Sequence, residues 1–325
     1  MNKLYPLRFR PVYKEKIWGG QRLKQLFGKS FAPLNNCGES WELSGVENNL
    51  SVVDNGFLAG NELPELAEIY MGDLLGDKVH AAGGHAFPLL FKFLDAADTL
   101  SVQVHPGDGY ALERHQCRGK AEMWYVLHAE AGAKIYSGFN QDMTPERFMQ
   151  HVKDGSIDTI LHAIDVNSGD VFYIPPGHIH AIGKGITLCE IQQASDITYR
   201  IFDWNREVSG GVPRKLHLEE ALDVLDFKAG NHQVDYEATP DKPVELVRNA
   251  FFTTRLLDFN KKITTDYFLV DSFVVYVCLE GGFTIVHPSG TEVVQAGDTV
   301  LLPAEIKTVE LVPRGRARLL ETYVP

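Results

Sequence analysis

Hydrophobic residues fall mostly in short runs along this chain, with turn-forming residues between the runs. Five runs are rich in β-branched and aromatic residues and are bounded by Gly, Pro, Asp or Asn, which is typical of β-strands. These runs are residues 101–105, 124–127, 171–174, 273–279 and 299–302. The pattern therefore predicts a mainly β protein.

Helical patterns are few. Residues 62–75 carry apolar residues at helical spacing. The stripe consists of Leu63, Leu66, Ile69, Tyr70 and Leu74. Residues 144–155 begin with a Thr that can cap a helix, continue with Pro and close on Gly, which predicts a helix with both ends marked. Two further helical patterns cover residues 109–116 and 216–225.

A short pattern of Gly-Asp, a four-residue strand and Pro occurs twice, at residues 169–175 (GDVFYIP) and 297–303 (GDTVLLP). Another predicted strand precedes each copy, at residues 124–127 and 274–279. A turn of this kind before a strand is typical of double-sheet jelly rolls. Since Gly-Asp turns are common in β proteins, an unrelated pair of antiparallel strands is the alternative. We expect two jelly-roll barrels with a few inserted helices.

A polar stretch at residues 228–243 contains two prolines, a glycine and an asparagine, and it reads as a linker. It divides the chain into two expected domains. Residues 1–230 would form the larger barrel with the inserted helices, and residues 245–325 the smaller barrel.

The charge balance disfavours two classes of partner. The 325 residues include 31 basic and 43 acidic side chains, a net charge of −12, and no Lys/Arg-rich tract offsets it. We therefore expect no binding to nucleic acid or to an anionic membrane surface. The longest apolar run, residues 273–279, has the length of a strand and is too short for a membrane span. The oligomeric state stays open.

The start of the chain has no long apolar segment followed by small residues, so we expect no export signal. The four cysteines, Cys37, Cys117, Cys189 and Cys278, lack CxxC spacing. In a chain of this length they are expected to be buried thiols rather than a disulfide framework. We expect an acidic, globular, cytoplasmic protein.

Polar side chains alternate with apolar ones along the predicted strand at residues 101–105. The two-residue period of a strand places Ser101, Gln103 and His105 on one face. Burying Gln and His without partners is costly, so this row requires an explanation. On the next strand Glu122 and Trp124 begin a similar row.

The first copy of the repeat continues as PGHIH at residues 176–180, whereas the second continues as AEIKT. Only the first barrel therefore offers histidines from this strand. The candidate ligands on neighbouring strands are Gln103, His105, Glu122 and one of His178 or His180. Strand parity does not separate the two histidines. Such a nitrogen and oxygen set suits Zn²⁺, with Fe²⁺ and Mn²⁺ as alternatives, although each histidine alone would read as a core or surface residue.

Charged residues follow the candidate metal site. A turn at residues 183–185 returns the chain as a strand that places Glu190 on the same face as His180. The other charged residues are Lys92, Lys120, Asp196, Arg200 and Arg206. A metal beside a carboxylate and several cations suits an anionic substrate that loses a carbon-bound proton. Taken singly, each cation would read as a surface residue. Walker, GxGxxG and GxSxG motifs are absent.

Seven segments, in order over most of the chain, resemble those of the type I phosphomannose isomerases, in particular their short bacterial branch. They are KIWGG at 16–20, GESWE at 38–42, FKFLDA at 91–96, SVQVHP at 101–106, GKAE at 119–122, PGHIHA at 176–181 and EIQQASDITYR at 190–200. The resemblance implies a zinc-dependent enzyme of cupin fold that interconverts mannose 6-phosphate and fructose 6-phosphate.

The resemblance also implies roles for individual residues. The implied ligands of one zinc ion are Gln103, His105, Glu122 and His180, because the ligand in the family is the histidine directly before Ala. It implies a catalytic role for Arg200. It places Trp18, Lys120, Glu190 and Asp196 in or near the substrate pocket, and Glu42 belongs to the same set of motifs. Arg206 lies where longer relatives carry a Lys.

The expected reaction is an aldose–ketose isomerisation through an enediol, in which a base moves a proton from C2 to C1. Glu190 is the expected base, and Arg200 and zinc would stabilise the negative charge on the substrate oxygens. Arg206 and Lys120 are the expected phosphate contacts, and Lys92 adds positive charge. Two alternatives are a metal-dependent cupin oxygenase and a non-catalytic sugar-phosphate-binding barrel.

Overall fold

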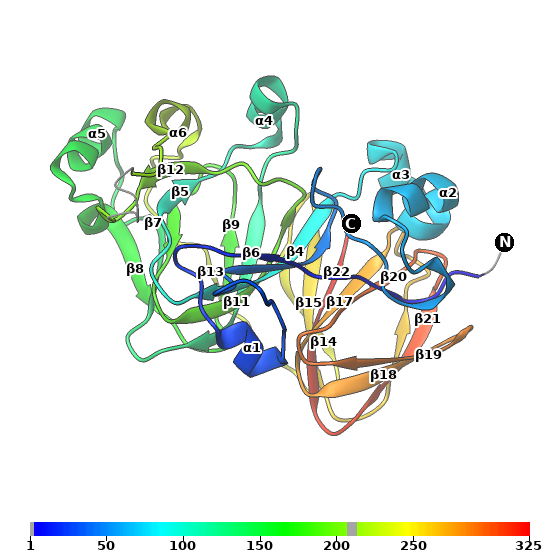
Figure 1. Cartoon of the computed structure of the whole chain (residues 1–325). Coiled ribbons are helices and arrows are strands. Elements are labelled where there is room, and N and C mark those ends of the chain that lie inside the picture. The colour runs from blue at the N-terminus through cyan, green and yellow to red at the C-terminus, as the bar shows by residue number, and fades with distance from the viewer. Residues whose placement is uncertain (1–2, 207–212) are drawn as a thin grey trace.

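The computed structural model describes residues 3–206 and 213–325, which form four antiparallel β-sheets with short helices on the outside (Figure 1). The sheets lie in two facing pairs. The first pair comes from the N-terminal part of the chain and the second mainly from the C-terminal part. The prediction of a mainly β protein with a few inserted helices is confirmed.

The first pair consists of a seven-stranded and a five-stranded sheet. In spatial order, the larger contains β13 (Gln233–Val234), β9 (Val171–Ile174), β6 (Glu122–Ala129), β11 (Ile186–Gln193), β4 (Leu89–Ala96), β3 (Glu39–Ser44) and β2 (Val12–Lys14). The smaller contains β12 (Tyr199–Phe202), β5 (Val102–Val104), β10 (His180–Ile182), β7 (Lys134–Phe139) and β8 (Leu161–Asp165). Trp124 and Phe172 of the larger sheet pack with Ile135 and Ile182 of the smaller in one buried cluster.

The second pair consists of a six-stranded and a four-stranded sheet. The larger contains β1 (Leu7–Arg8), β20 (Thr299–Leu302), β17 (Val274–Glu280), β22 (Ala317–Tyr323), β15 (Thr253–Phe259) and β14 (Pro243–Arg248). The smaller contains β16 (Ile263–Asp266), β21 (Thr308–Pro313), β18 (Gly282–His287) and β19 (Gly290–Gln295). Tyr276 and Leu319 pack against Phe283 and Ile285 between the two sheets.

Strand register supports the internal repeat. Trp124 of β6 lies opposite Phe172 of β9, and Tyr276 of β17 lies opposite Val300 of β20. Phe172 and Val300 are each the fourth residue of the Gly-Asp pattern. The repeat therefore extends to the neighbouring strand. At the start of that strand, Glu122 of the first copy corresponds to Val274 of the second.

The two larger sheets contribute their outer faces to one apolar cluster, so the four sheets form consecutive layers. This cluster contains Phe91 and Met123 of the seven-stranded sheet and Val275 and Leu320 of the six-stranded sheet. At roughly 1.5–3 kcal/mol for each fully buried large apolar side chain, this interface is a major contribution to stability.

Within residues 3–206 and 213–325, six α-helices accompany the sheets. They are α1 (Arg22–Phe27), α2 (Leu63–Leu75), α3 (Asp77–Gly83), α4 (Asp108–His115), α5 (Pro145–Asp154) and α6 (Leu218–Val224), with two 3₁₀ turns at Gly56–Leu58 and Ile157–Ile160. The four predicted helices are confirmed, whereas α1 and α3 were not predicted. Helices α4, α5 and α6 lie beside the five-stranded sheet (Figure 1). Phe148 of α5 and Ala221 of α6 share a buried cluster with Val104 of β5.

The caps of α5 are as the sequence predicts. The Thr144 hydroxyl accepts a hydrogen bond from the backbone N–H of Arg147, and Gly155 closes the helix with φ 67°. The stripe predicted along α2 is only partly correct, because Ile69 is 57% exposed. Met71 has a non-helical φ of 45°, so the helical spacing is interrupted between Tyr70 and Leu74.

The predicted linker at residues 228–243 is not wholly irregular. Its residues Gln233–Val234 form β13, which adds an edge strand beside β9. The first strand, β1, pairs with β20 and so joins the sheet of the C-terminal part. Three of the cysteines are buried, Cys117 is partly exposed, and all four are free thiols. Within the described ranges, the helices are too short or too polar to cross a membrane.

Candidate metal centre and substrate pocket

His105, Glu122 and His180 meet between the two sheets of the first pair. His105 directly follows β5, whereas Glu122 and His180 begin β6 and β10. The Nε2 atom of His180 lies 3.4 Å from one carboxylate oxygen of Glu122, and that of His105 lies 3.6 Å from the other. All three side chains are at most 1% exposed. These residues could hold a metal ion.

Backbone carbonyls fix the orientation of both imidazole rings. The Nδ1 atom of His105 lies 2.9 Å from the carbonyl oxygen of Ile197, and that of His180 lies 2.8 Å from the carbonyl oxygen of His178. Since a carbonyl only accepts, each Nδ1 carries the proton and donates. Each Nε2 therefore offers its lone pair to the cluster, which is the tautomer of metal-binding histidines.

The surroundings of the cluster favour the protonation states in which its three side chains can bind a cation. Burial alone would raise the pKa of Glu122, but Lys120 and the two imidazoles hold this pKa well below its ordinary value. Burial lowers the pKa of His180 well below its ordinary value and also lowers that of His105. The set therefore consists of a carboxylate and neutral imidazoles, the forms that bind metals.

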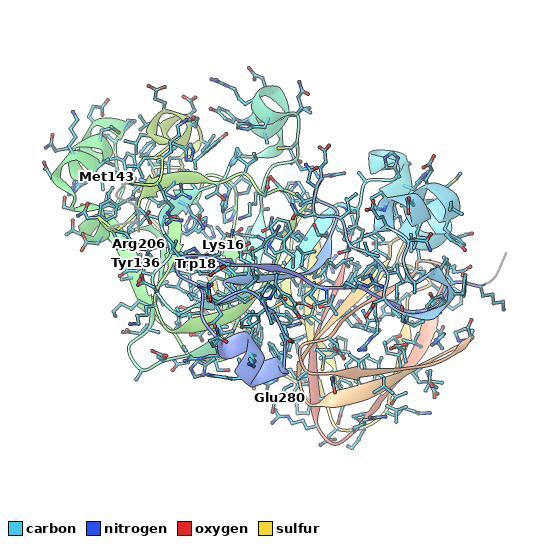
Figure 2. The ribbon with its side chains drawn as sticks, viewed as in Figure 1. Lys16, Trp18, Tyr136, Met143, Arg206 and Glu280 are labelled. Carbon is cyan, nitrogen blue, oxygen red and sulfur yellow. The ribbon has the colours of Figure 1, made fainter. Side chains whose placement is uncertain are left out.

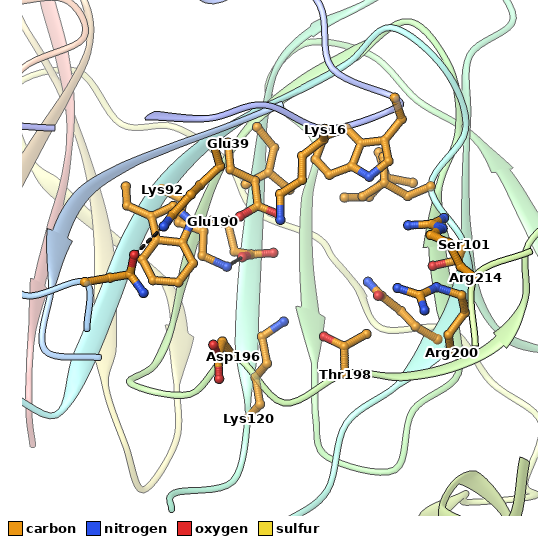
Figure 3. Close-up of a pocket in the computed structure, with 18 residues that line it drawn as sticks. Lys16, Glu39, Lys92, Ser101, Lys120, Glu190, Asp196, Thr198, Arg200 and Arg214 are labelled. Carbon is orange, nitrogen blue, oxygen red and sulfur yellow. Dashed lines mark hydrogen bonds and ion pairs between the residues drawn. The ribbon is translucent and has the colours of Figure 1, made fainter. Parts of the chain in front are cut away.

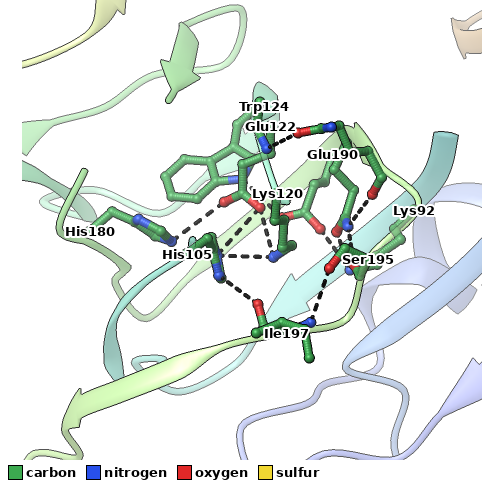
Figure 4. A network of polar contacts seen from close by, with 12 residues as sticks. Lys92, His105, Lys120, Glu122, Trp124, His180, Glu190, Ser195 and Ile197 are labelled. Carbon is green, nitrogen blue, oxygen red and sulfur yellow. Dashed lines mark hydrogen bonds and ion pairs between the residues drawn. The ribbon is translucent and has the colours of Figure 1, made fainter. Parts of the chain in front are cut away.

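Three atoms of the cluster that could bind a metal are buried without a well-aligned hydrogen bond from any described residue. They are both carboxylate oxygens of Glu122 and Nε2 of His180. The ammonium group of Lys120 lies 2.7 Å from Glu122 and 3.0 Å from Nε2 of His105 (Figure 4). Within the described residues, Nε2 of His180 and the Glu122 oxygen that faces it therefore lack a partner, which is costly for buried acceptors. The ion pair of the other Glu122 oxygen with Lys120 shows that the cluster attracts a cation. The residues present therefore fit a metal ion.

The structure separates the two histidines that strand parity did not. His178 lies in the turn before β10, and its Nε2 is 2.9 Å from the hydroxyl of Ser137. Its ring packs against His232, with ring centroids 4.5 Å apart. Burial, with a smaller effect of His232, lowers the pKa of His178 to about 3. His178 thus lies outside the cluster that contains His180.

A cavity of about 430 Å³ opens beside the cluster. Its lining comes from both sheets of the first pair and from the chain segment before β3, on which Lys16 and Trp18 lie (Figures 2 and 3). The lining residues are Lys14, Lys16, Trp18, Glu39, Trp41, Asn49, Lys92, Leu94, Leu100, Ser101, Gln103, Lys120, Ile182, Glu190, Asp196, Thr198, Arg200 and Arg214. They include seven predicted site residues: Trp18, Lys92, Gln103, Lys120, Glu190, Asp196 and Arg200.

Basic residues outnumber acidic ones around this cavity by six to three. Several form ion pairs within the wall. Lys92 lies 2.8 Å from Glu190 and also donates to Gln192 (2.6 Å), while Lys16 pairs with Glu39 (3.1 Å). The surplus positive charge makes the cavity suitable for an anionic ligand.

Arg200 differs from the other cations of the cavity. Its guanidinium donates to the carbonyl of Lys215 (2.9 Å), whereas its Nε is buried without a partner among the described residues. Across residues 3–206 and 213–325 the guanidinium lacks a carboxylate within ion-pair distance, unlike that of Arg214. Burial and the neighbouring Arg214 lower the pKa of Arg200. An anionic ligand bound beside Arg200 would therefore stabilise its positive charge.

Arg206 is not among the residues that line the cavity. Its guanidinium donates to the carbonyl of Thr99 and lies 3.5 Å from Asp98. Glu42 is also directed elsewhere, because it pairs with Lys29 (2.8 Å) behind β3. Neither residue is among those that line the cavity.

Sequence reasoning missed several lining residues. Glu39 and Trp41 lie on β3, whose two-residue period places them opposite to Ser40 and Glu42. Both lie in the GESWE segment, which was a usable signal. Thr198 lies in the EIQQASDITYR segment, which was a signal of the same kind, whereas Lys14, Asn49 and Arg214 carried none.

Comparisons with known proteins agree with this geometry. Residues 6–118 match the family model described as phosphomannose isomerase type I, catalytic domain. The chain is 38% identical to the mannose-6-phosphate isomerase of Streptococcus mutans, over 93% of this chain and 94% of that protein. It is 36% identical to mannose-6-phosphate isomerase ManA of Bacillus subtilis, over 92% and 93%. The crystal structure of the mannose 6-phosphate isomerase from Bacillus subtilis superimposes with a TM-score of 0.88 at 31% identity, covering 98% of this chain and 99% of that one.

The paired antiparallel sheets and the buried His–Glu–His cluster define a cupin-like protein with a site that could bind a metal ion. Within that class, the identity and coverage shared with these relatives show that the chain belongs to the type I phosphomannose isomerase family.

Proposed function

We propose that the protein interconverts mannose 6-phosphate and fructose 6-phosphate, with one zinc ion held in the first pair of sheets. The observation that carries this proposal is the position of the buried cluster beside a cavity whose Arg200 has no carboxylate partner. The family relationship supports the same substrate. All lining residues precede residue 215, so we assign the activity to the N-terminal domain, residues 1–230, and a supporting role to residues 245–325.

We assign His105, Glu122 and His180 as metal ligands, with Gln103 as the fourth. Gln103 lies directly opposite His180 across β5 and β10, and it lines the cavity. Two imidazole nitrogens, a carboxylate oxygen and the amide oxygen of Gln103 are a ligand set that suits Zn²⁺. When bound there, the metal supplies Lewis-acid stabilisation of negative charge on substrate oxygens.

Two side chains of the cavity, Arg200 and Glu190, are assigned to catalysis. Arg200 would be a catalytic residue that holds the charged substrate in position, because a preorganised cation needs no reorganisation during the reaction. Glu190 is our candidate for the base that moves the proton between C2 and C1. Its carboxylate faces the cavity and is held by Lys92 and by the indole N–H of Trp124 (3.0 Å).

Three further residues would bind and orient the sugar. Asp196 and Trp18 line the cavity and are assigned to the sugar hydroxyls and the apolar sugar face. Lys120 lies between the cluster and the cavity, where its ammonium can donate to an oxygen of the substrate. Because these groups come from different strands and loops, they can fix the sugar in one orientation.

The reaction can be tested in D₂O. Mannose 6-phosphate supplied to the zinc-loaded protein should give fructose 6-phosphate that carries deuterium at C1, since a base that exchanges its proton with solvent returns deuterium. Proton NMR of the product measures this incorporation. Absence of fructose 6-phosphate would contradict the proposed function, whereas product without deuterium would contradict only proton transfer through an exchanging base.

A further inference from the structure

One end of the cavity is formed by two arginines that are close in sequence but differ in their partners. Ser101, Arg200 and Arg214 lie together at this end, opposite Lys92 and Glu39 (Figure 3). Arg214 follows β12 by twelve residues and belongs to no motif that the sequence analysis singled out. Its function is therefore open.

Asp203 holds the guanidinium of Arg214 in place. The Nε of Arg214 donates to Oδ2 of Asp203 at 2.8 Å, and Nη2 donates to Oδ1. The Asp203 side chain is only 12% exposed. Two parallel hydrogen bonds fix the plane of a guanidinium. Within the described part of the chain, Nη1 has no hydrogen-bond partner, so this group is fixed and still has N–H donors available.

The charges at this end do not cancel. Arg200, Arg206 and Arg214 contribute three positive charges, and Asp98 and Asp203 contribute two negative charges, which leaves one positive charge in excess. Arg200 is half-buried and lies close enough to Arg214 to be repelled by it. An anion bound between them would relieve this repulsion, and planar guanidinium groups match the oxygens of a phosphate.

Arg206, the phosphate contact expected from the sequence, is engaged elsewhere. It donates to the carbonyl of Thr99 and lies near Asp98 and Asp203. Arg206 is not among the residues that line the cavity, although its buried Nη1 has no hydrogen-bond partner among the described residues. Arg214 is thus the second guanidinium that this end of the cavity offers.

Strand register places this end at a suitable distance from the metal centre. Arg200 lies opposite Gln103, and Gln103 lies opposite His180, on the consecutive strands β12, β5 and β10. Neighbouring strands are about 4.8 Å apart, so Arg200 and His180 are separated by roughly 10 Å at the backbone. A six-carbon sugar can bridge such a separation, with its reacting carbons near the cluster and its phosphate near the arginines.

We propose that Arg214, fixed by Asp203, binds the substrate phosphate together with Arg200 and so selects phosphorylated sugars. This inference rests on the proposed function. It assigns to Arg214 the task that the sequence suggested for Arg206.

The test compares R214Q with R206Q, and R248Q serves as a control because Arg248 is exposed on β14 and pairs with Glu245. Losing a hydrogen bond to a charged group lowers the binding affinity about 10- to 100-fold. We expect R214Q to lower kcat/KM for mannose 6-phosphate by this factor, mainly through KM. The inhibition constant of inorganic phosphate should rise by a similar factor, while the amount of bound zinc stays unchanged. Tm should fall somewhat, because Asp203 loses its two hydrogen bonds from Arg214. R214K should recover part of the loss, and R248Q should match the wild type.

The inference is overturned if R214Q behaves like the wild type, if its loss appears in kcat alone, or if R206Q carries the loss instead. Calorimetric titration with inorganic phosphate separates this result from the proposed function. A wild-type protein that lacks isomerase activity but binds phosphate through Arg214 would contradict the function and support the site. A wild-type protein that fails to bind phosphate would overturn the inference.

Discussion

Glu321 occupies the position in the six-stranded sheet that Glu190 occupies in the seven-stranded sheet. Glu190 lies opposite Lys92 on the neighbouring strand, and Glu321 lies opposite Arg255. The two ion pairs measure 2.8 Å and 3.4 Å. Each carboxylate also accepts a hydrogen bond from an aromatic side chain, an indole at 3.0 Å in one case and a tyrosine hydroxyl at 2.6 Å in the other. Of the two, only Glu190 lines the cavity beside the metal-ligand cluster.

This correspondence gives a matched pair of variants. E190Q should lower kcat for mannose 6-phosphate by about 100-fold, as expected when a general base is removed, with zinc retained. E321Q should leave kcat unchanged but lower the free energy of unfolding by about 1–2 kcal/mol, because it weakens a buried charge-assisted hydrogen bond. Steady-state kinetics, metal analysis and urea unfolding measure these effects. Equal losses of activity in both variants would show that Glu190 acts only as a structural residue.

Lys29 and Glu42 form a buried ion pair that joins the two parts of the chain. Their charged atoms lie 2.8 Å apart, and Lys29 also donates to the carbonyl of Gly297 (3.0 Å), in the Gly-Asp turn of the second repeat. K29M would leave Glu42 buried and unpaired, so we expect a loss of about 3–5 kcal/mol in the free energy of unfolding. The double variant K29M/E42L should lose less, because neither charge remains.

The exposed pair Arg10–Asp54, with a separation of 3.0 Å, provides the control for that experiment. R10Q should change the free energy of unfolding by no more than about 1 kcal/mol, since exposed ion pairs contribute little. Chemical denaturation of the variants gives the comparison. If K29M costs as little as R10Q, the buried pair does not stabilise the contact between the two parts.

Asp258 makes the stability of the C-terminal part depend on pH. Hydrogen bonds from Arg316 (2.7 and 2.6 Å), and also from Arg318, hold the pKa of this carboxyl below its ordinary value, although burial opposes the shift. Because the folded-state pKa lies below the unfolded value of about 3.9, the ionised carboxylate contributes stability above about pH 4. This contribution is lost as the pH falls through the folded-state pKa.

D258N should therefore be less stable than the wild type at neutral pH, by about 1–2 kcal/mol. The difference should shrink as the pH falls below about 4. Guanidinium unfolding at several pH values measures it. A difference that stays constant with pH would mean that packing, rather than the charge of Asp258, accounts for the loss.

Local signals in the sequence were sufficient for much of the fold. The capped helix α5, the paired Gly-Asp turns and the alternation in β5 depend on residues that are close in the chain, so the sequence predicted them. Helices α1 and α3 have no side chain that caps their N-terminus. β13 is a two-residue edge strand that is defined only by its pairing with β9. These elements depend on tertiary contacts that local patterns do not encode.

In the candidate site, too, some residues could be predicted from local sequence patterns, whereas others are positioned by tertiary contacts. Gln103, His105 and Glu122 follow strand alternation, and the sequence brought them together with a histidine of the PGHIH segment. Alternation did not choose between His178 and His180 because residues two apart fall on the same face of a strand. The structure begins β10 only at His180. His178 lies in a turn, where the two-residue period does not apply. The position of Arg214 depends on its ion pair with Asp203, which the sequence does not reveal.

We propose that isomerisation of mannose 6-phosphate requires a metal ion held by His105, Glu122 and His180. The most direct measurement couples fructose 6-phosphate formation to an indicator reaction, with protein before chelation, after chelation and after readdition of Zn²⁺. We predict activity before chelation, loss of activity after it and recovery with Zn²⁺, with about one zinc bound per chain. Unchanged activity in fully demetallated protein would contradict the claim, as would a zinc-loaded protein that does not convert mannose 6-phosphate.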